Sequence, residues 1–404
     1  MRTKLTPVAD ALAHLLSCAR KTGHSEHIPL VEALGSVLAE DIRADLAVPA
    51  YDNSAMDGYA ILASDCDERG GELVVTQTIA AGHPGQPLVA GTAARIFTGA
   101  PIPEGADAVV MQENTTRERD RVTILHPPRV GENIRLAGHD IAVGTTVLEK
   151  GRRLQPQDLG LLASLGLTAV EVWRPLTVAL LNTGDEVVTQ GRVLKPGQLY
   201  DSNSFTLAGL LQSLGMEVIK LGIVSDDLQA TVQALQNAAR QADCVITTGG
   251  VSVGDADFVK AAVEQLGSLS LWKLAIKPGK PFSFGRLGEI PFFGLPGNPV
   301  AVFITFVTLV RPFLLKMQGV SEPSLVTLNV RAGFSVAEAG SRQEYLRVRL
   351  EQHEDGGPIA RLYPDQSSSV LTSLSWADGL TVVPINTTVQ PGQWLEYLPF
   401  KGVL

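Results

Sequence analysis

Residues 244–257 read Cys-Val-Ile-Thr-Thr-Gly-Gly-Val-Ser-Val-Gly-Asp-Ala-Asp, an apolar run followed by a glycine-rich loop. The apolar run does not alternate with polar residues, which is typical of a strand buried on both faces of a parallel sheet. A helical pattern follows over residues 257–266. Backbone amides and a helix N-terminus therefore meet in the loop, and that arrangement binds phosphate. A tight turn whose glycines only relieve crowding is the alternative, and the loop alone does not decide.

The same alternation of strand and helix extends to both sides of this loop. Further apolar runs predict strands at residues 177–181, 217–223, 272–276 and 291–294. Helical patterns occupy residues 203–214, 227–241 and 299–317. The rhythm predicts a doubly wound α/β domain, and ligands of such domains bind at the carboxyl ends of the strands.

Two further loops lie at that predicted edge of the sheet. Lys277-Pro278-Gly279-Lys280-Pro281 follows Lys273, so three lysines cluster around a rigid turn. Residues 294–299, Gly-Leu-Pro-Gly-Asn-Pro, end a strand and start a helix, and Asn298 lies in this loop. Lysine ammonium groups and backbone amides suit a phosphate or another oxyanion. Either loop alone could be a solvated turn, but three loops at one edge favour an anion site.

Residues 250–254 also match the G-x-S-x-G pattern of α/β-hydrolases, with Ser252 as the nucleophile. Such a triad needs a later histidine, and the only one is His353, in a charged stretch near the C-terminus. No H-G-G-G oxyanion segment precedes Ser252. The hydrolase interpretation is therefore the weaker one.

Acidic residues also follow the predicted strands. Glu186, Asp226 and Asp257 lie at or near strand ends. Carboxylates beside a phosphate site usually indicate a divalent cation, because they would otherwise repel the ligand. Helix N-capping is the alternative for some of them.

The remaining sequence divides by texture. We expect residues 1–44 and 138–175 to form a segmented helical domain and residues 45–137 an inserted β-rich domain. Residues 176–324 are the α/β domain. After it the helical patterns stop, and residues 325–404 predict a C-terminal β-domain that could close into a small barrel.

Composition narrows the function classes. The net charge of −9 and the 5% aromatic content argue against a nucleic-acid-binding surface. Three scattered cysteines argue against a zinc ribbon or a disulfide framework and favour a reducing compartment. No signal peptide is predicted, and the most apolar stretch, residues 300–310, is too short to span a bilayer. We therefore expect a cytoplasmic protein without membrane association.

Six motifs occur in order along the chain, at residues 49–60, 98–101, 183–186, 248–257, 277–281 and 295–299. Together they resemble the molybdopterin molybdenumtransferase family, which includes the bacterial MoeA proteins and the E domain of gephyrin. The resemblance covers nearly the whole chain. It implies four domains, with a segmented first domain, an inserted β-rich domain and a C-terminal β-barrel-like domain. It also implies a homodimer whose cleft lies between the α/β domain of one subunit and the inserted domain of the other.

The resemblance assigns roles to particular positions. The expected catalytic residues are Asp57, Thr98, Asp140, Glu186, Asp226 and Asp257, with Glu186, Asp226 and Asp257 as ligands of Mg²⁺. The expected substrate-binding residues are Gly249, Gly250, Ser252, Lys273, Lys277, Lys280, Asn298, Arg347 and Ser368. Arg347 and Ser368 align with an oxyanion site. Because Ser367-Ser368-Ser369 replaces the usual Gly-Ser-Gly, the register of the serine is open by one residue.

The implied reaction inserts molybdate into adenylylated molybdopterin and releases AMP. Mg²⁺ would offset the charge that develops at the anhydride. Two alternatives remain: a molybdopterin-binding scaffold without turnover, and a molybdopterin adenylyltransferase, which would resemble only the middle third of the chain. Other cofactor-synthesis proteins are possible partners. Molybdate and tungstate cannot be told apart from the sequence.

Overall fold

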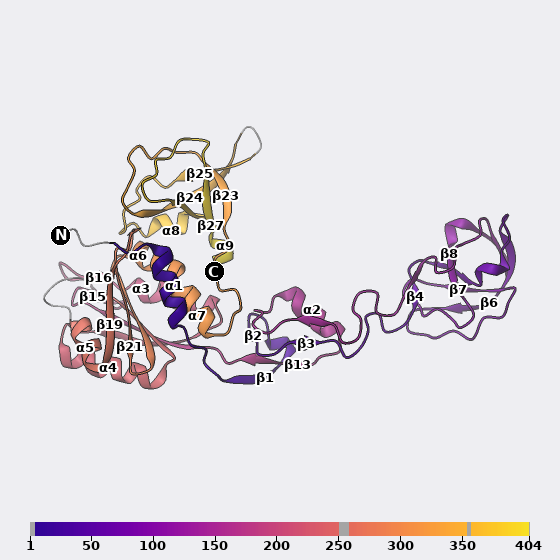
Figure 1. Cartoon of the computed structure of the whole chain (residues 1–404), viewed down its shortest axis with the longest axis horizontal. Helices are drawn as coiled ribbons and strands as arrows, with labels where there is room; N and C mark the ends of the chain where they lie inside the picture. The colour runs from indigo at the N-terminus through magenta and orange to yellow at the C-terminus, as the bar shows by residue number, and fades with distance from the viewer. Residues whose placement is uncertain (1–4, 250–257, 354–356, 404) are drawn as a thin grey trace.

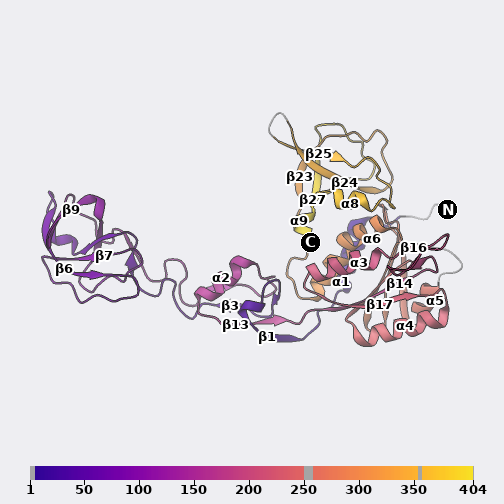
Figure 2. The same cartoon turned by 180° about the vertical axis from the view of Figure 1, so that it is seen from behind.

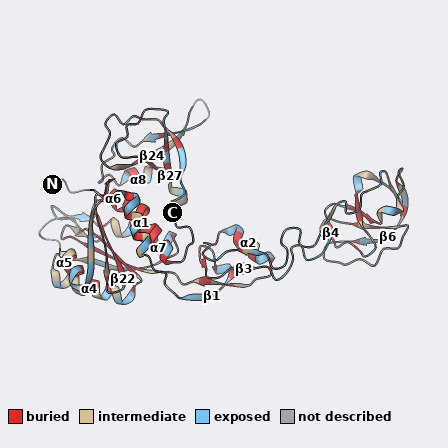
Figure 3. Cartoon of the chain, viewed as in Figure 1, coloured by how far each residue is buried: buried red, intermediate tan, exposed pale blue. Residues whose placement is uncertain are grey.

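The computed structural model describes residues 5–249, 258–353 and 357–403. The molecule is elongated, with the α/β domain and the C-terminal domain at one end and the inserted domain at the other (Figures 1 and 2). The segmented domain connects the two ends. Red, buried residues concentrate inside each part of the molecule (Figure 3). Each part therefore has its own core.

The segmented domain is built on a three-stranded sheet of order β1-β13-β2. Helix α2 (Pro156–Ser164) covers it, with its N-terminus fixed by a capping box between Gln155 and Asp158. The strands are β1 (Ser25–Pro29), β2 (Val37–Leu38) and β13 (Ala169–Trp173), and a second pair joins β3 (Ile42–Arg43) to β12 (Thr146–Leu148).

The first helix packs elsewhere. α1 (Val8–Cys18) buries Val8, Ala11 and Leu15 in the core of the α/β domain. Their i, i+3, i+7 spacing forms one apolar stripe.

The inserted domain is a six-stranded sheet of order β8-β5-β7-β6-β10-β9. Its strands are β5 (Gly58–Ile61), β6 (Gly71–Ile79), β7 (Thr92–Ile96), β8 (Ala108–Met111), β9 (Thr115–Glu118) and β10 (Arg121–Ile124). Two connecting strands, β4 (Asn53–Ser54) and β11 (Ile134–Arg135), pair where the chain enters and leaves it.

The α/β domain carries a six-stranded sheet of order β17-β14-β18-β22-β21-β19. The strands are β14 (Thr177–Thr183), β17 (Glu217–Val224), β18 (Cys244–Thr248), β19 (Gly267–Lys273), β21 (Pro281–Leu287) and β22 (Ile290–Leu295). The first four in spatial order are parallel, and every residue of β18 is buried. Helices α4 (Leu228–Gln241) and α5 (Phe258–Leu266) cover one face, while α3 (Asn203–Ser213) and the long apolar helix cover the other. The doubly wound prediction is confirmed.

One predicted strand was misplaced. Residues 272–276 are not a parallel strand, because β19 ends at Lys273 and pairs antiparallel with β21 at the sheet edge. Serines alternate with apolar residues at positions 268 and 270, as expected for an edge strand. β21 escaped prediction because it begins at Pro281, and proline is tolerated only at strand starts and edges.

The long apolar helix spans Pro299–Met317 as α6 (Pro299–Thr305), a π-helical turn (Phe306–Val310) and α7 (Arg311–Met317). Its 19 residues are long and apolar enough to cross a membrane, but 94% of the most apolar window is buried within the protein. Phe306, Leu309 and Phe313 lie in the main core of the α/β domain. We therefore interpret it as a core helix.

The C-terminal domain is a closed barrel of five strands, β24-β25-β23-β27-β26, in which β26 pairs back onto β24. The strands are β23 (Leu328–Ala332), β24 (Gln343–Gln352), β25 (Pro358–Leu362), β26 (Gly379–Val383) and β27 (Trp394–Pro399). A short strand of the α/β domain, β20 (Ile276–Lys277), adds to β24 in parallel. This backbone pairing joins the two domains beside the lysine loop.

Candidate functional site

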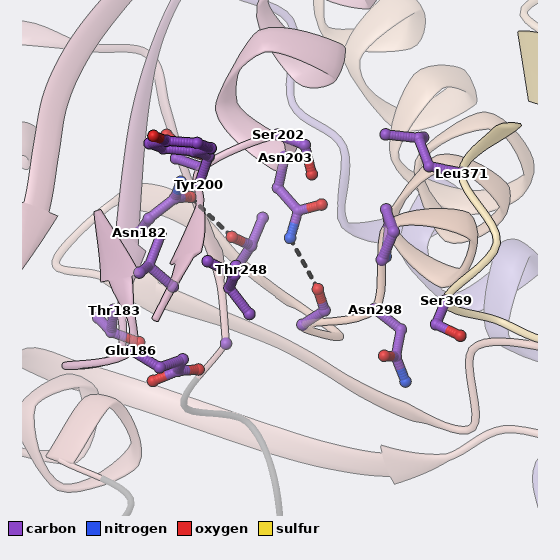
Figure 4. A pocket seen from close by; sticks show the side chains of 16 residues that line it. Asn182, Thr183, Glu186, Tyr200, Ser202, Asn203, Thr248, Asn298, Ser369 and Leu371 are labelled. Carbon is purple, nitrogen blue, oxygen red and sulfur yellow. Dashed lines mark hydrogen bonds between the residues drawn. The ribbon is translucent and has the colours of Figure 1, made fainter. Parts of the chain in front are cut away.

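A cavity of about 540 Å³ lies at the carboxyl ends of β14, β18 and β22. Figure 4 shows polar side chains converging on it from β14, from the start of α3 and from the loop before α6. This is the position at which parallel α/β sheets bind their ligands. The cavity is lined by Asn182, Thr183, Glu186, Tyr200, Asn203, Thr248, Gly249, Asn298 and Ser369, among others.

The floor of this first cavity depends on Gly249. The residue has φ +81°, a left-handed conformation, and an added Cβ would lie 2.9 Å from the carbonyl oxygen of Thr183. Any other residue would be strained and would collide with the neighbouring backbone. The Gly249 amide donates to the carbonyl oxygen of Leu295, 3.2 Å away, so β18 and β22 are held together beyond the end of the sheet.

Side-chain hydrogen bonds fix the cavity wall. The Thr248 hydroxyl donates to Oδ1 of Asn182 at 2.6 Å, and Nδ2 of Asn203 donates to the carbonyl oxygen of Gly297 at 2.8 Å (Figure 4). Because a carbonyl only accepts, the Asn203 amide is oriented with its Oδ1 away from Gly297. That oxygen and the Thr183 hydroxyl are buried without a hydrogen-bond partner among the described residues. Unpaired buried polar groups are unfavourable, so a bound ligand that paired with them would be stabilised.

The carboxylates at the strand ends have different surroundings. Glu186 lines the first cavity. Asp226 is exposed, and its amide donates to Oδ1 of Asp185 at 3.3 Å. Asp227, not Asp226, caps α4 by accepting from the amide of Ala230 at 2.8 Å. The side chain of Asp226 is thus free of the capping role that was its alternative.

No three His, Cys, Asp or Glu side chains within the described ranges are grouped closely enough to hold a metal ion. Asp257, the third expected ligand, lies outside these ranges, as do Gly250 and Ser252.

A second cavity, of about 450 Å³, lies between the α/β domain and the barrel. It shares Gly297 and Asn298 with the first cavity, so the loop before α6 separates the two. Its charged lining is cationic, with Lys277 and Lys280 from the α/β domain and Arg342 from the barrel side. Gln366, Ser367 and Ser368 complete it from the barrel. Such a lining suits an oxyanion.

Lys273 and Asp140 lie elsewhere. Lys273 is at the end of β19 and is not among the described residues that line either cavity. Its backbone oxygen accepts from the amide of Thr6 at 2.9 Å, which attaches the segment before α1. Asp140 is exposed in the connection between the segmented and inserted domains, where its amide donates to the oxygen of Val48 at 3.0 Å.

Arg347 acts from beneath the serine loop. Its side chain is fully buried and lines neither cavity. Nη2 donates to the Ser367 oxygen at 3.0 Å, and Nε donates to the Ser373 hydroxyl at 3.0 Å. Burial lowers the pKa of the Arg347 guanidinium to about 10. Nη1 has no partner among the described residues. Arg347 therefore holds the loop that presents Ser368.

The serine loop in turn docks on the α/β domain. The Ser368 oxygen accepts from the amide of Val300 at 3.1 Å, in the first turn of α6. First-turn amides have no partner within their own helix, so this bond fixes the loop against the helix N-terminus.

Asp57 and Thr98 meet in the inserted domain. Oδ1 of Asp57 accepts from both the amide and the hydroxyl of Thr98, each at 2.8 Å. These two hydrogen bonds lower the pKa of Asp57, and the charge of Arg95 adds to the effect. Both residues are exposed. The inserted domain lies at the far end of the molecule from both cavities (Figures 1 and 2), so within one chain the pair does not reach them.

Three family models match the chain in order. They are the MoeA N-terminal region (domain I and II) over residues 6–166, a probable molybdopterin binding domain over 179–316, and the MoeA C-terminal region (domain IV) over 329–400. A molybdopterin molybdenumtransferase of Nostoc is 38% identical over 383 residues, which are 90% of this chain and 86% of that protein. The chain belongs to the MoeA family.

Other MoeA-family proteins agree with this assignment. The Bacillus subtilis molybdopterin molybdenumtransferase is 33% identical over 398 residues, 96% of this chain and 92% of the relative. The crystal structure of a molybdopterin biosynthesis MoeA protein from Pyrococcus horikoshii superposes with a TM-score of 0.85 at 32% identity, covering 98% of this chain and 100% of that one. The resemblance seen in the sequence and the multidomain fold are both confirmed.

Three residues of the site were not anticipated. Arg342 lines the second cavity, Asn203 the first, and Glu344 forms an ion pair with Lys277 at 3.0 Å. Arg342 and Glu344 lie on or next to β24, and only the β20–β24 pairing brings that strand to the lysine loop. No local sequence signal reports such a pairing between domains.

Proposed function

We propose that this MoeA-family transferase inserts molybdate into adenylylated molybdopterin and releases AMP. The observation that carries the proposal is the pair of cavities separated by the loop at Gly297 and Asn298. One cavity is polar, with a carboxylate and unpaired hydrogen-bonding groups. The other has a cationic lining. A large substrate with a ring system and phosphates and a small oxyanion could then be held side by side.

In the proposed arrangement, the pterin and its phosphates occupy the first cavity, with the phosphates at the amides after β18. Molybdate occupies the second cavity, near Lys277, Lys280, Arg342 and Ser368. Water adds to a phosphorus atom of the anhydride and AMP departs. The two dithiolene sulfurs then bind molybdenum, while their protons leave with one oxygen of molybdate as water.

The carboxylate set suits a hard divalent cation. Glu186 and Asp226 offer oxygen ligands at neighbouring strand ends, and Mg²⁺ prefers oxygen and keeps several waters. We propose that these two residues and Asp257 hold Mg²⁺, which would neutralise negative charge on the phosphates. Glu186 and Asp226 also position the attacking water by accepting its protons.

We further propose a homodimer in which Asp57 and Thr98 of one subunit complete the site of the other. The support is their distance from both cavities in their own chain (Figures 1 and 2). A two-fold axis would complete both sites at once. The free thiols of Cys18, Cys66 and Cys244 suit the proposed cytoplasmic location, where further cofactor-synthesis proteins could deliver the pterin.

The test is incubation with adenylylated molybdopterin, molybdate and Mg²⁺, with AMP measured. Molybdate-dependent AMP release is expected, and leaving out Mg²⁺ should slow it. Pterin binding without AMP release would instead identify a scaffold. AMP or pyrophosphate chemistry that requires ATP and free molybdopterin would identify an adenylyltransferase. The hydrolase alternative predicts esterase activity that Ser252→Ala abolishes.

A further inference from the structure

Lys277, in the second cavity, already has an anionic partner. Its Nζ donates to both carboxylate oxygens of Glu344, at 3.0 and 3.1 Å. The Lys277 side chain is 49% exposed and that of Glu344 is 16% exposed. An oxyanion that binds Lys277 must therefore compete with a carboxylate that is held at the edge of the same cavity.

The ion pair is not needed to join the two domains. Ile276 and Lys277 pair with Gln343 and Glu344 through their backbones, and the Gln343 amide donates to the oxygen of Ala275 at 2.8 Å. A half-exposed ion pair adds little stability to such a contact. A carboxylate beside a cationic cavity is also unfavourable for anion binding, so its presence there calls for a functional reason.

We propose that Glu344 is the resident counter-ion of the oxyanion cavity, and that it weakens the binding of dianions so that the bound oxyanion can leave toward the pterin. The inference rests on the proposed function of the second cavity. When the cavity is empty, Glu344 neutralises Lys277. When a tetrahedral dianion arrives, Lys277 turns to it and the carboxylate repels it. Glu344 is thus a positioning residue that acts through Lys277 and through its own charge.

Charge gives the proposal a distinctive signature. Coulomb energy scales with the charge of the bound ion, so removing one negative charge helps a dianion twice as much, in free energy, as a monoanion of the same shape. The gain in affinity for the dianion should then be about the square of the gain for the monoanion. A merely structural role of Glu344 would change both affinities by the same factor.

The experiment is calorimetric titration of the full chain with tungstate, a tetrahedral dianion, and perrhenate, a tetrahedral monoanion of similar size. Glu344→Gln should bind tungstate about tenfold more tightly and perrhenate about threefold more tightly than the unsubstituted protein. Glu351→Gln is the matched control, because Glu351 also lies on β24 and also pairs with a cation, Arg361, at 3.2 Å. It should change neither affinity. Glu344→Ala serves as a second neutral variant if the glutamine variant does not fold.

The outcomes separate the two proposals. If the unsubstituted protein binds neither oxyanion, the proposed oxyanion cavity is wrong and the role of Glu344 falls with it. If it binds tungstate, but Glu344→Gln leaves the affinity unchanged, lowers it, or shifts both ions equally, only the counter-ion proposal is overturned. An equal gain in Glu351→Gln would also overturn it, since the effect would then be one of overall charge.

Discussion

The two ends of the molecule hold their polar groups in different ways. At the α/β end, loops from two domains enclose two cavities, and buried atoms of Thr183 and Asn203 lack partners within the described structure. At the other end, Asp57 and Thr98 satisfy each other on an open surface. The first arrangement is prepared to bind a ligand. The second is preorganised but lacks a cavity, so it can serve a reaction only against another surface.

The largest effect should come from the open end. Asp57→Ala removes a group that we assign to proton transfer or water positioning, and such groups typically contribute 10²- to 10⁴-fold to a rate. We expect AMP release to fall by about that factor while pterin binding to the first cavity changes by less than about twofold. Stopped assays of AMP and calorimetric titration of the pterin measure the two effects.

Asp120→Ala is the control for this comparison, because Asp120 lines a separate pocket on the same domain. It should leave AMP release unchanged. Pterin binding that falls in parallel with the rate in Asp57→Ala would remove the distinction between a binding end and a completing end.

The next effect concerns the cationic cavity. Lys277→Ala removes one of its cations and should weaken oxyanion binding about ten- to hundred-fold, since a charge-assisted hydrogen bond contributes roughly 1.5–3 kcal/mol. The loss should shrink at high salt. Lys316→Ala removes an exposed lysine from the end of α7 and should have no effect. Equal oxyanion affinities of the two variants at low salt would return Lys277 to the class of solvated surface lysines.

Arg342 and Arg347 separate contact from support. Arg347→Met breaks the buried bonds to the serine loop and should lower the free energy of unfolding by about 2–4 kcal/mol. Arg342→Met should change stability by less than about 0.5 kcal/mol, yet weaken oxyanion binding about tenfold. Denaturant unfolding and calorimetric titration give both quantities. Loss of oxyanion binding in Arg347→Met without loss of stability would place Arg347 in contact with the anion.

The smallest effect is on a pKa. The Thr98 bonds stabilise the Asp57 carboxylate, so their contribution to folding is present above the unfolded-state pKa and is lost as the pH falls through the lower folded-state pKa. Thr98→Val removes the hydroxyl bond and keeps the amide bond. The pKa of Asp57 should rise, and the acid limb of the rate profile should move to higher pH. Carbon NMR of the Asp57 carboxyl group follows this directly, and an unchanged pKa would show that the hydroxyl bond is unimportant.

The sequence predicted the local features well. The buried strand β18, the helix at Pro299–Met317 and the loop at Gly297 and Asn298 follow from apolar runs, helical periodicity and turn residues, which act over a few positions. Contacts between domains did not follow. The β20–β24 pairing, the burial of Arg347 and the packing of α1 against the α/β domain depend on tertiary arrangement, to which a single sequence gives no local signal.

The central claim is that the two ends complete one site across two subunits, and mixed dimers test it most directly. Asp57→Ala subunits have a defective open end, and Glu186→Ala subunits have a defective first cavity. In a heterodimer of the two, one of the two sites contains only unsubstituted residues. We predict that purified heterodimers release AMP at about half the rate of the unsubstituted dimer, while each homodimer is nearly inactive. Heterodimers as inactive as both parents would contradict the claim and show that each site is built within one chain.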